Sequence, residues 1–163
     1  MLKWSALVLI VAFATPAFAD ATADAKAHSE AFAKACEAGD VPGVMALYTD
    51  DATVVWPGAG EEAKGKAKIE KLVTDLCNPK SNPKLINKSI EGIPLGDSHI
   101  VTVGHWEVSL TDANGKRTTS HLRTTEVIVK SGAGWRYVVD HASIGLPPPK
   151  AAAKAGAKAT QKK

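Results

Sequence analysis

The stretch Glu37–Gly58, EAGDVPGVMALYTDDATVVWPG, decides the fold. Its first residues end one helix and begin another: Gly39 stands where a helix commonly ends in the left-handed conformation, and Asp40 can cap a second helix with Pro42 in its first turn. The β-branched residues Thr53, Val54 and Val55 and the aromatic Trp56 then follow, before a Pro-Gly turn. The stretch therefore predicts a helix, a short helix and a strand in quick succession.

The short helix is expected to place Val44, Leu47 and Tyr48 on one face. The adjacent Asp50 and Asp51 raise the question of whether two carboxylates act in chemistry here. Their position between a helix and a strand is explained by capping alone, so we expect them to close the helix and open the strand.

Two longer helices flank this stretch. Residues 21–38 are rich in alanine, with Phe32 as their single large apolar side chain. Residues 65–77 carry apolar side chains at helical spacing and a charged opposite side. The apolar positions of this second helix are Ile69, Leu72, Val73 and Leu76.

After residue 84 the pattern changes to that of strands, rich in Val, Ile, Thr and aromatic residues and separated by hairpin turns. The expected strands are 85–93, 99–110, 117–130 and 135–144. The fold class is therefore α+β, with three N-terminal helices packed on a strongly curved antiparallel sheet that forms a cone.

The two ends of the chain differ from this domain. Residues 1–19 read as a cleavable signal peptide, with a short apolar run and a small-x-small site that ends at Ala19, which predicts a periplasmic or secreted protein. The domain is expected over 20–146, and 147–163 as a proline stretch and a disordered Lys/Ala-rich tail.

Charge is unevenly distributed along the chain. Residues 20–149 hold 14 Lys and Arg against 17 Asp and Glu, whereas residues 150–163 hold five Lys and no acid. We therefore expect no nucleic-acid partner for the domain. The tail is either solvated or makes weak contact with anionic surfaces.

Cys36 and Cys77 are the only cysteines. In an exported protein a pair favours a disulfide, while two small buried thiols remain the alternative. Four of the five histidines, His99, His105, His121 and His141, are spread over three strands and both faces, so no metal site is expected, and no cofactor.

The pieces EAGDVPGVMALYTDDATVVWPG, GKAKIEKLV and GWRYVVDHAS together resemble the nuclear transport factor two-like superfamily, with its SnoaL-like cyclases, ketosteroid isomerases and kinase association domain. The resemblance covers about 21–146. It implies the cone fold, a pocket on the concave face of the sheet and a homodimer formed through the sheet. One cone serves many activities, so the resemblance alone implies no single function.

Three positions depart from the ketosteroid isomerase pattern. The catalytic base before the proline aligns with Trp56, the phenolic donor of the first helix with Phe32, and the acid on the penultimate strand with Thr125. Steroid isomerase activity is therefore not expected.

Strand registers predict which residues face the pocket. If Lys130 pairs with Trp135, then Thr125 pairs with Asp140, and His121, Arg123 and Thr125 share a face with Val138 and Asp140. His141, Trp135 and Tyr137 would face outward. A two-residue Asn114-Gly115 turn would place Trp106 opposite Arg123, whereas a longer turn would place His105 there.

The expected site combines these residues. Asp140 and His121 are the candidate catalytic groups, although an internal Asp140–Arg123 ion pair would explain Asp140 without chemistry. The candidate ligand-binding residues are Tyr48, Trp56, Trp106, Arg123, Thr125 and Val138.

Three functions remain open at this point. The first is an exported domain that binds a small apolar or mixed-polarity molecule. The second is an acid–base enzyme of the isomerase, cyclase or hydrolase type that uses Asp140 with His121 or Arg123. The third is a homo-oligomerisation module with a vestigial pocket.

Overall fold

A computed structural model describes residues 17–58, 62–132 and 134–145, and side-chain surroundings from Ala21 onward. The expected signal peptide, most of which precedes Ala17, and the Lys/Ala-rich tail lie outside these residues. Of the described helices, none is both long enough and apolar enough to cross a membrane.

The described chain folds as the α+β class predicted, with three α-helices and a six-stranded sheet. The helices are α1 (Ala17–Glu37), α2 (Val41–Met45) and α3 (Lys66–Leu76), with a 3-10 turn over Pro79–Ser81. The strands are β1 (Tyr48–Val55), β2 (Ala63–Lys64), β3 (Lys84–Leu95), β4 (His99–Thr111), β5 (Arg117–Ser131) and β6 (Gly134–Ile144).

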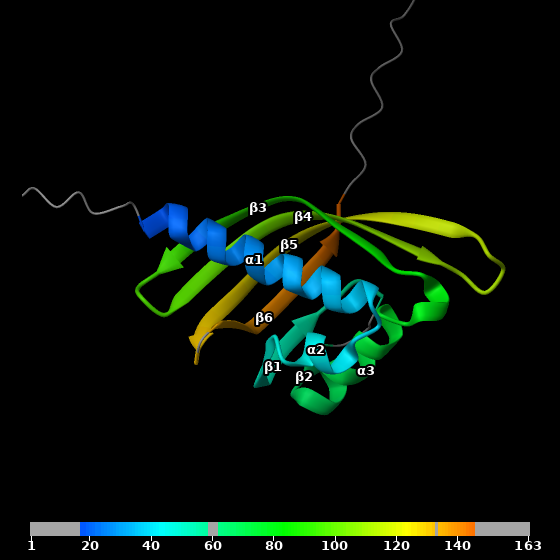
Figure 1. Ribbon diagram of the computed structural model, residues 1–163, viewed down its shortest axis with the longest axis horizontal. Helices are drawn as coiled ribbons and strands as arrows, with labels where there is room; N and C mark the ends of the chain where they lie inside the picture. The colour runs from blue at the N-terminus through cyan, green and yellow to red at the C-terminus, as the bar shows by residue number, and fades with distance from the viewer. Residues whose placement is uncertain (1–16, 59–61, 133, 146–163) are drawn as a thin grey trace, which may run out of the picture.

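The strand order is β2-β1-β6-β5-β4-β3. The long strands β3 to β6 form the expected antiparallel meander, but β1 runs parallel to β6, so the sheet is mixed. Figure 1 shows α1 lying along the long strands, while α2 and α3 gather beside β1 and β2 at one side of the sheet. The helices thus cover one face of the curved sheet.

The local signals around Gly39 act as expected, with one difference. Gly39 ends α1 with φ of 71°, and the Asp40 side chain accepts a hydrogen bond of 2.9 Å from the Gly43 amide. However, α2 ends at Met45, and Tyr48 already belongs to β1. Asp50 and Asp51 are exposed residues within β1, so the prediction that they close the short helix is wrong.

Cys36 and Cys77 form a disulfide with an S–S distance of 2.09 Å. Both are fully buried, and the bond joins the last turn of α1 to the residue that follows α3. The larger core groups that surround these elements include Phe32, Tyr48, Ile69, Trp106, Ile128 and Tyr137. The disulfide therefore ties two helices together within the core.

Two irregularities set the registers of the long strands. The β4–β5 turn spans Asp112–Lys116 instead of two residues, because the Asp112 carboxylate accepts hydrogen bonds from the amides of Asn114 and Lys116 at 2.8 and 2.9 Å. The β5–β6 register begins as predicted, with Lys130 opposite Trp135, but shifts by one residue at Val138. A shift of one residue moves every later side chain to the other face.

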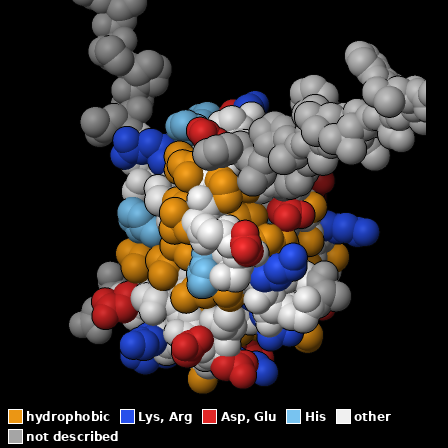
Figure 2. Space-filling view, turned by 90° about the vertical axis from the view of Figure 1, so that its left-hand side faces the viewer, with side chains coloured by type: hydrophobic (Ala, Val, Ile, Leu, Met, Phe, Trp, Pro, Cys, Tyr) orange, Lys and Arg blue, Asp and Glu red, His pale blue; other side chains and the backbone are white. Residues whose placement is uncertain are grey.

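Several large apolar side chains remain exposed. They are Val55, Ile86, Leu95, Val103, Val139 and Ile144. Figure 2, which views the molecule from the left-hand side of Figure 1, shows hydrophobic side chains gathered over the middle of that face, with charged side chains around them. Contiguous apolar surface of this kind is a common feature of interaction sites.

Candidate functional site

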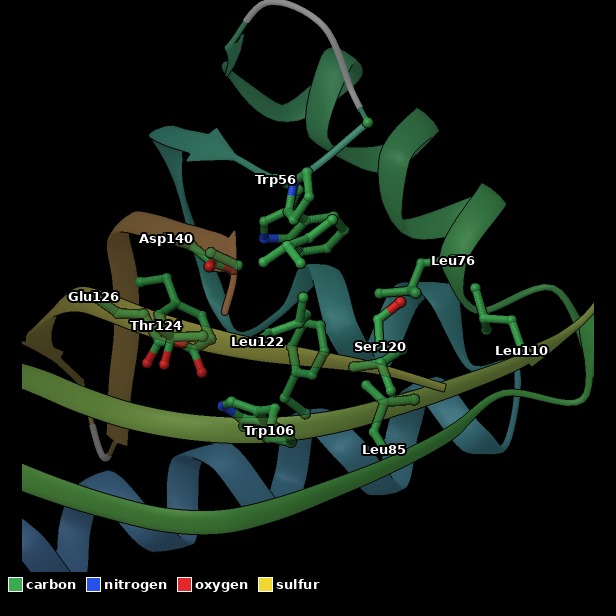
Figure 3. Close-up of a pocket in the computed structure, with 17 residues that line it drawn as sticks. Trp56, Leu76, Leu85, Trp106, Leu110, Ser120, Leu122, Thr124, Glu126 and Asp140 are labelled. Atoms are coloured by element: carbon green, nitrogen blue, oxygen red, sulfur yellow. The ribbon is translucent and has the colours of Figure 1, made fainter. Parts of the chain in front are cut away.

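A cavity of about 290 Å³ lies between the helices and the inner face of the sheet. Most of its wall is apolar, and it is near the small end of the range for small-molecule sites. The apolar lining includes Phe32, Trp56, Leu76, Leu85, Trp106, Val108, Leu110, Leu122, Tyr137, Ala142 and Ile144. Figure 3 shows Trp56 and Trp106 on opposite sides of this space.

Three polar side chains of the cavity, Asp140, Glu126 and Thr124, gather at one end, whereas Ser120 lies beside Leu76 and Leu85, as Figure 3 shows. Leu110 and Leu76 lie at the other end. Asp140 comes from β6 and the other two polar residues from β5, on the strand pair that crosses the middle of the sheet. The cavity is therefore an apolar chamber with an acidic end.

Asp140 is held by a residue from the first strand. It is 4% exposed, and its Oδ2 accepts a hydrogen bond of 2.5 Å from the Tyr48 hydroxyl. Burial raises the pKa of Asp140, while the side chains of Tyr48 and Trp56, and the charge of His141, oppose that rise. Burial also raises the pKa of Tyr48 well above 10, so its hydroxyl keeps the proton that it donates.

Glu126 is the second buried acid, with 3% of its surface exposed. Its Oε2 accepts a hydrogen bond from the Thr102 hydroxyl. Burial and the neighbouring Asp140 raise the pKa of Glu126 to about 8, against the opposing influence of the Thr102 and Thr124 hydroxyls. At pH 7 Glu126 therefore holds a proton inside the cavity.

Asp140 and Glu126 form a pair, because they stand directly opposite each other on antiparallel β6 and β5. Side chains in such positions have Cβ atoms about 5 Å apart. Two carboxyl groups this close do not ionise independently, since the first charge disfavours the second. The pair therefore offers one proton donor and one acceptor to whatever enters the cavity.

No Lys, Arg or His belongs to the described lining. The candidate ion-pair partner Arg123 lies opposite Ser143 and is exposed. The acidic end is thus stabilised by the Glu126 proton and by hydroxyl donors, with no basic side chain in the described lining. The described residues also hold no group of three His, Cys, Asp or Glu arranged for a metal ion.

The structure brings together only part of the predicted site. Asp140, Trp56 and Trp106 line the cavity. Tyr48 lies outside the lining and donates a hydrogen bond from its hydroxyl to Asp140. His141 is exposed, on the opposite face from Asp140, as the alternation of strand residues predicted.

Four predicted residues lie elsewhere. His121, Arg123 and Thr125 are exposed on the outer face of β5, where the His121 side chain is 72% accessible and 3.8 Å from Glu107. Val138 is the extra residue of the bulge and does not line the cavity. The expectation that these residues share a face with Asp140 is wrong, because the bulge at Val138 shifts the β5–β6 register by one residue.

The bulge and the five-residue turn explain what the sequence analysis missed. Glu126 pairs with Asp140 where Thr125 was expected, and Trp106 lies opposite Leu122 while His105 lies opposite Arg123. Tyr137, expected on the outer face, is 2% exposed and lines the cavity. The signal for Glu126 was present as the single acid in a Val-, Ile- and Thr-rich strand.

A buried histidine lies behind the cavity wall. The His28 ring, on α1, packs against the Tyr137 ring with centroids 4.3 Å apart. Burial lowers the pKa of His28 to about 4, so the ring is neutral at pH 7. Its Nε2 is buried without a hydrogen-bond partner among the described residues, as is the Thr124 hydroxyl at the acidic end.

A model of the SnoaL-like domain matches residues 25–147. The chain belongs to the SnoaL-like family. No curated protein matches this SnoaL-like chain. Similar solved structures include a ketosteroid isomerase-like protein from Erwinia carotovora atroseptica, with 22% identity and a TM-score of 0.64, over 80% of this chain and 100% of that one.

Two further structures resemble this SnoaL-like protein. One, from Streptomyces avermitilis, is provisionally described as a dehydratase of the NTF2-like family; it has 15% identity and a TM-score of 0.69, over 79% of this chain and 99% of that one. The other is an NTF2-like protein with a cystatin-like fold from Novosphingobium aromaticivorans. It has 16% identity and a TM-score of 0.64, over 82% of this chain and 86% of that one. At these identities the likeness shows the fold.

Proposed function

We propose that the protein is an exported domain that binds a small, largely apolar molecule in the cavity between α1, α3 and the sheet. The observation that carries the proposal is the cavity itself, about 290 Å³ in volume, with aromatic and aliphatic walls and three polar side chains gathered at one end. The pattern of residues 1–19 supports export.

The binding test uses naphthalene as an uncharged ring probe and tryptophan fluorescence as the readout, since Trp56 and Trp106 line the cavity. Ser120→Phe places a ring in the cavity from β5, and we expect it to abolish quenching. His121→Phe is the matched control, because it places the same ring one residue further on, at an exposed position. Equal quenching of both variants would reject binding in the cavity.

A second candidate, an acid–base enzyme, is supported by the Asp140–Glu126 pair. In such an enzyme Glu126 would be the second acid–base group beside Asp140, because His121 and Arg123 lie on the other face of the sheet. Asp140 would accept a proton from a carbon next to a carbonyl, while the Glu126 proton bonds the carbonyl oxygen. Deuterium incorporation into 1-tetralone in D₂O, followed by NMR, tests this chemistry; no protein-dependent exchange, or equal exchange by Asp140→Asn, would reject it.

Self-association through the outer face of the sheet is compatible with either function. Val103 on β4, Val139 on β6 and Val55 on β1 are all at least 36% exposed. We propose that they belong to a homodimer interface. Analytical ultracentrifugation should then show the wild-type protein as a dimer. Val139→Glu should dissociate this dimer, whereas the control variant Leu95→Glu should not. A wild-type protein that sediments as a monomer would reject the dimer.

A further inference from the structure

The acidic end of the cavity lacks a countercharge. Asp140 and Glu126 are both more than nine-tenths buried, and the described lining holds no Lys, Arg or His. Buried carboxylates are normally paired with a cation or coordinate a metal, since desolvation makes an isolated charge costly. A purely structural acid pair would gain from a basic side chain beside it in the cavity, and the described lining has none; His141, whose charge acts on Asp140, lies on the opposite face.

Both acids keep capacity to bind a ligand. Asp140 accepts a hydroxyl bond from Tyr48, with the Trp56 side chain as a second donor, and Glu126 accepts one from Thr102, whereas an ionised carboxyl group can accept about four. The Thr124 hydroxyl, near Glu126 on β5, is buried and makes no hydrogen bond of standard geometry with the described residues. The acidic end therefore presents several oxygen acceptors that the described protein groups leave open.

Aromatic rings surround this end. Phe32 packs edge-on against Trp56, Trp106 and Tyr137, with centroid distances of 6.2, 6.5 and 6.3 Å. All four rings line the cavity. The faces of such rings attract cations, and the attraction is strongest where water is excluded.

We propose that the cavity binds an organic ammonium ion, whose charged head lies between Asp140, Glu126 and the aromatic rings and whose apolar body extends toward Leu76 and Leu110. This inference rests on the proposed binding function and names its ligand class. The head would donate hydrogen bonds to the two carboxyl groups and to Thr124, and it would supply the missing positive charge. Anionic ligands would meet two acids and no base.

The titratable groups around the pair give this binding a pH dependence. They are Tyr48 on β1 and Tyr137 on β6, both protonated throughout the neutral range, neutral His28 behind Tyr137, and His141 on the opposite face. Glu126 has a pKa of about 8, so it loses its proton as the pH rises toward 8. An alkylammonium, with a pKa near that of Lys, stays charged over this range, so its affinity should rise from pH 6 to pH 8.

Three probes of one size test the proposal by calorimetry: 2-phenylethylamine, 2-phenylethanol and phenylacetate. We expect the amine to bind about tenfold or more tightly than the alcohol at pH 7.5, and phenylacetate to bind least, because a charge-assisted and cation–π contact replaces a neutral one. The amine's affinity should increase from pH 6 to pH 8 while that of the alcohol does not.

Isosteric variants locate the effect. Asp140→Asn should remove most of the preference for the amine, and Glu126→Gln should remove the increase in the amine's affinity from pH 6 to pH 8. Both variants should leave the affinity for the alcohol nearly unchanged. Glu107→Gln is the matched control, since it removes one acid from an element of the same sheet outside the cavity. Thermal melts of all variants verify that each is folded at the temperature of the titration.

The outcomes separate the two proposals. An alcohol that binds as tightly as the amine, or a preference that Asp140→Asn leaves intact, would overturn the ammonium assignment while binding of naphthalene in the cavity stands. Failure of the amine to bind where naphthalene does would overturn it equally. Failure of naphthalene and all three probes would reject both proposals.

Discussion

The hydroxyl of Tyr48 donates a hydrogen bond of 2.5 Å to Oδ2 of Asp140, and this bond joins the first strand to the last inside the protein. The two residues are 92 positions apart in the sequence. The bond fixes the orientation of the Asp140 carboxyl group at the end of the cavity. It also makes Tyr48 a determinant of the ionisation of Asp140.

Tyr48→Phe should destabilise the protein by about 1–3 kcal/mol at pH 8, because it leaves a buried carboxylate oxygen without its donor. The pKa of Asp140 should rise further, since its ionised form loses a hydrogen bond. Urea unfolding at pH 8 and at pH 5 measures both effects, with a smaller loss expected at pH 5. A double-mutant cycle with Asp140→Asn provides the control: equal costs of Tyr48→Phe in the two backgrounds would contradict this role of the bond.

Stability should fall as the pH rises from 6.5 to 8, and Glu126 should be the main cause. Its pKa is raised from 4.5 to about 8, so over this range the folded protein holds a proton that the unfolded chain has already released. The linkage slope for one such group is at most about 1.4 kcal/mol per pH unit. Glu126→Gln should reduce the dependence of the unfolding free energy on pH, measured by urea unfolding, whereas the control variant Glu107→Gln should leave that dependence unchanged. A wild-type protein that gains stability over this range would refute the assignment to Glu126.

His28 should have the opposite effect at lower pH. Its pKa is lowered from 6.5 to about 4, so between these values the unfolded chain binds a proton that the folded protein excludes, and stability rises with pH. Between about 4.5 and 6.5 this gain opposes the loss due to Glu126, so the wild-type stability should fall less steeply with pH than it would without His28.

His28→Phe should expose that compensation, because it keeps an aromatic ring against Tyr137 and removes the titrating group. Its stability should fall steadily from pH 4.5 to pH 8. The double variant with Glu126→Gln should keep only the fall that the raised pKa of Asp140 contributes. A His28→Phe profile that parallels the wild type would show that His28 does not titrate differently on folding.

Loss of the disulfide should be costly. The bond closes a loop between residues 41 positions apart, and the chain-entropy relation gives about 4 kcal/mol for a loop of that length. Cys36→Ala/Cys77→Ala should therefore unfold at lower urea concentration than the oxidised protein. Wild-type protein unfolded with dithiothreitol is the control, and it should resemble the variant; unchanged stability in both would contradict the prediction.

Much of the fold was predictable because its signals are local. Gly39 and Asp40 mark a helix boundary, and the spacing of Ile69, Leu72, Val73 and Leu76 predicts α3 to within one residue at each end. The alternation of side chains along β6 placed Asp140 inside and His141 outside. These inferences depend only on neighbouring residues.

The cavity lining was less predictable because it depends on two registers. The Asp112 side chain builds a five-residue turn around an Asn-Gly pair that usually makes a two-residue one, and Val138 adds a residue to β6. No pattern in the sequence marks Val138 as different from Val139. The predicted pocket therefore contained Arg123 and Thr125, and it lacked Thr124 and Glu126.

The bulge at Val138 also affects how this chain can be compared with its relatives. Regular pairing of Val138, with every residue kept and no bulge, would bring His141 and Ser143 to the inside of the sheet and turn Asp140 outward, with no substitution anywhere. An ungapped alignment across β6 would then equate interior positions with exterior ones. Pocket chemistry in such comparisons is read safely only after the register of this strand has been matched.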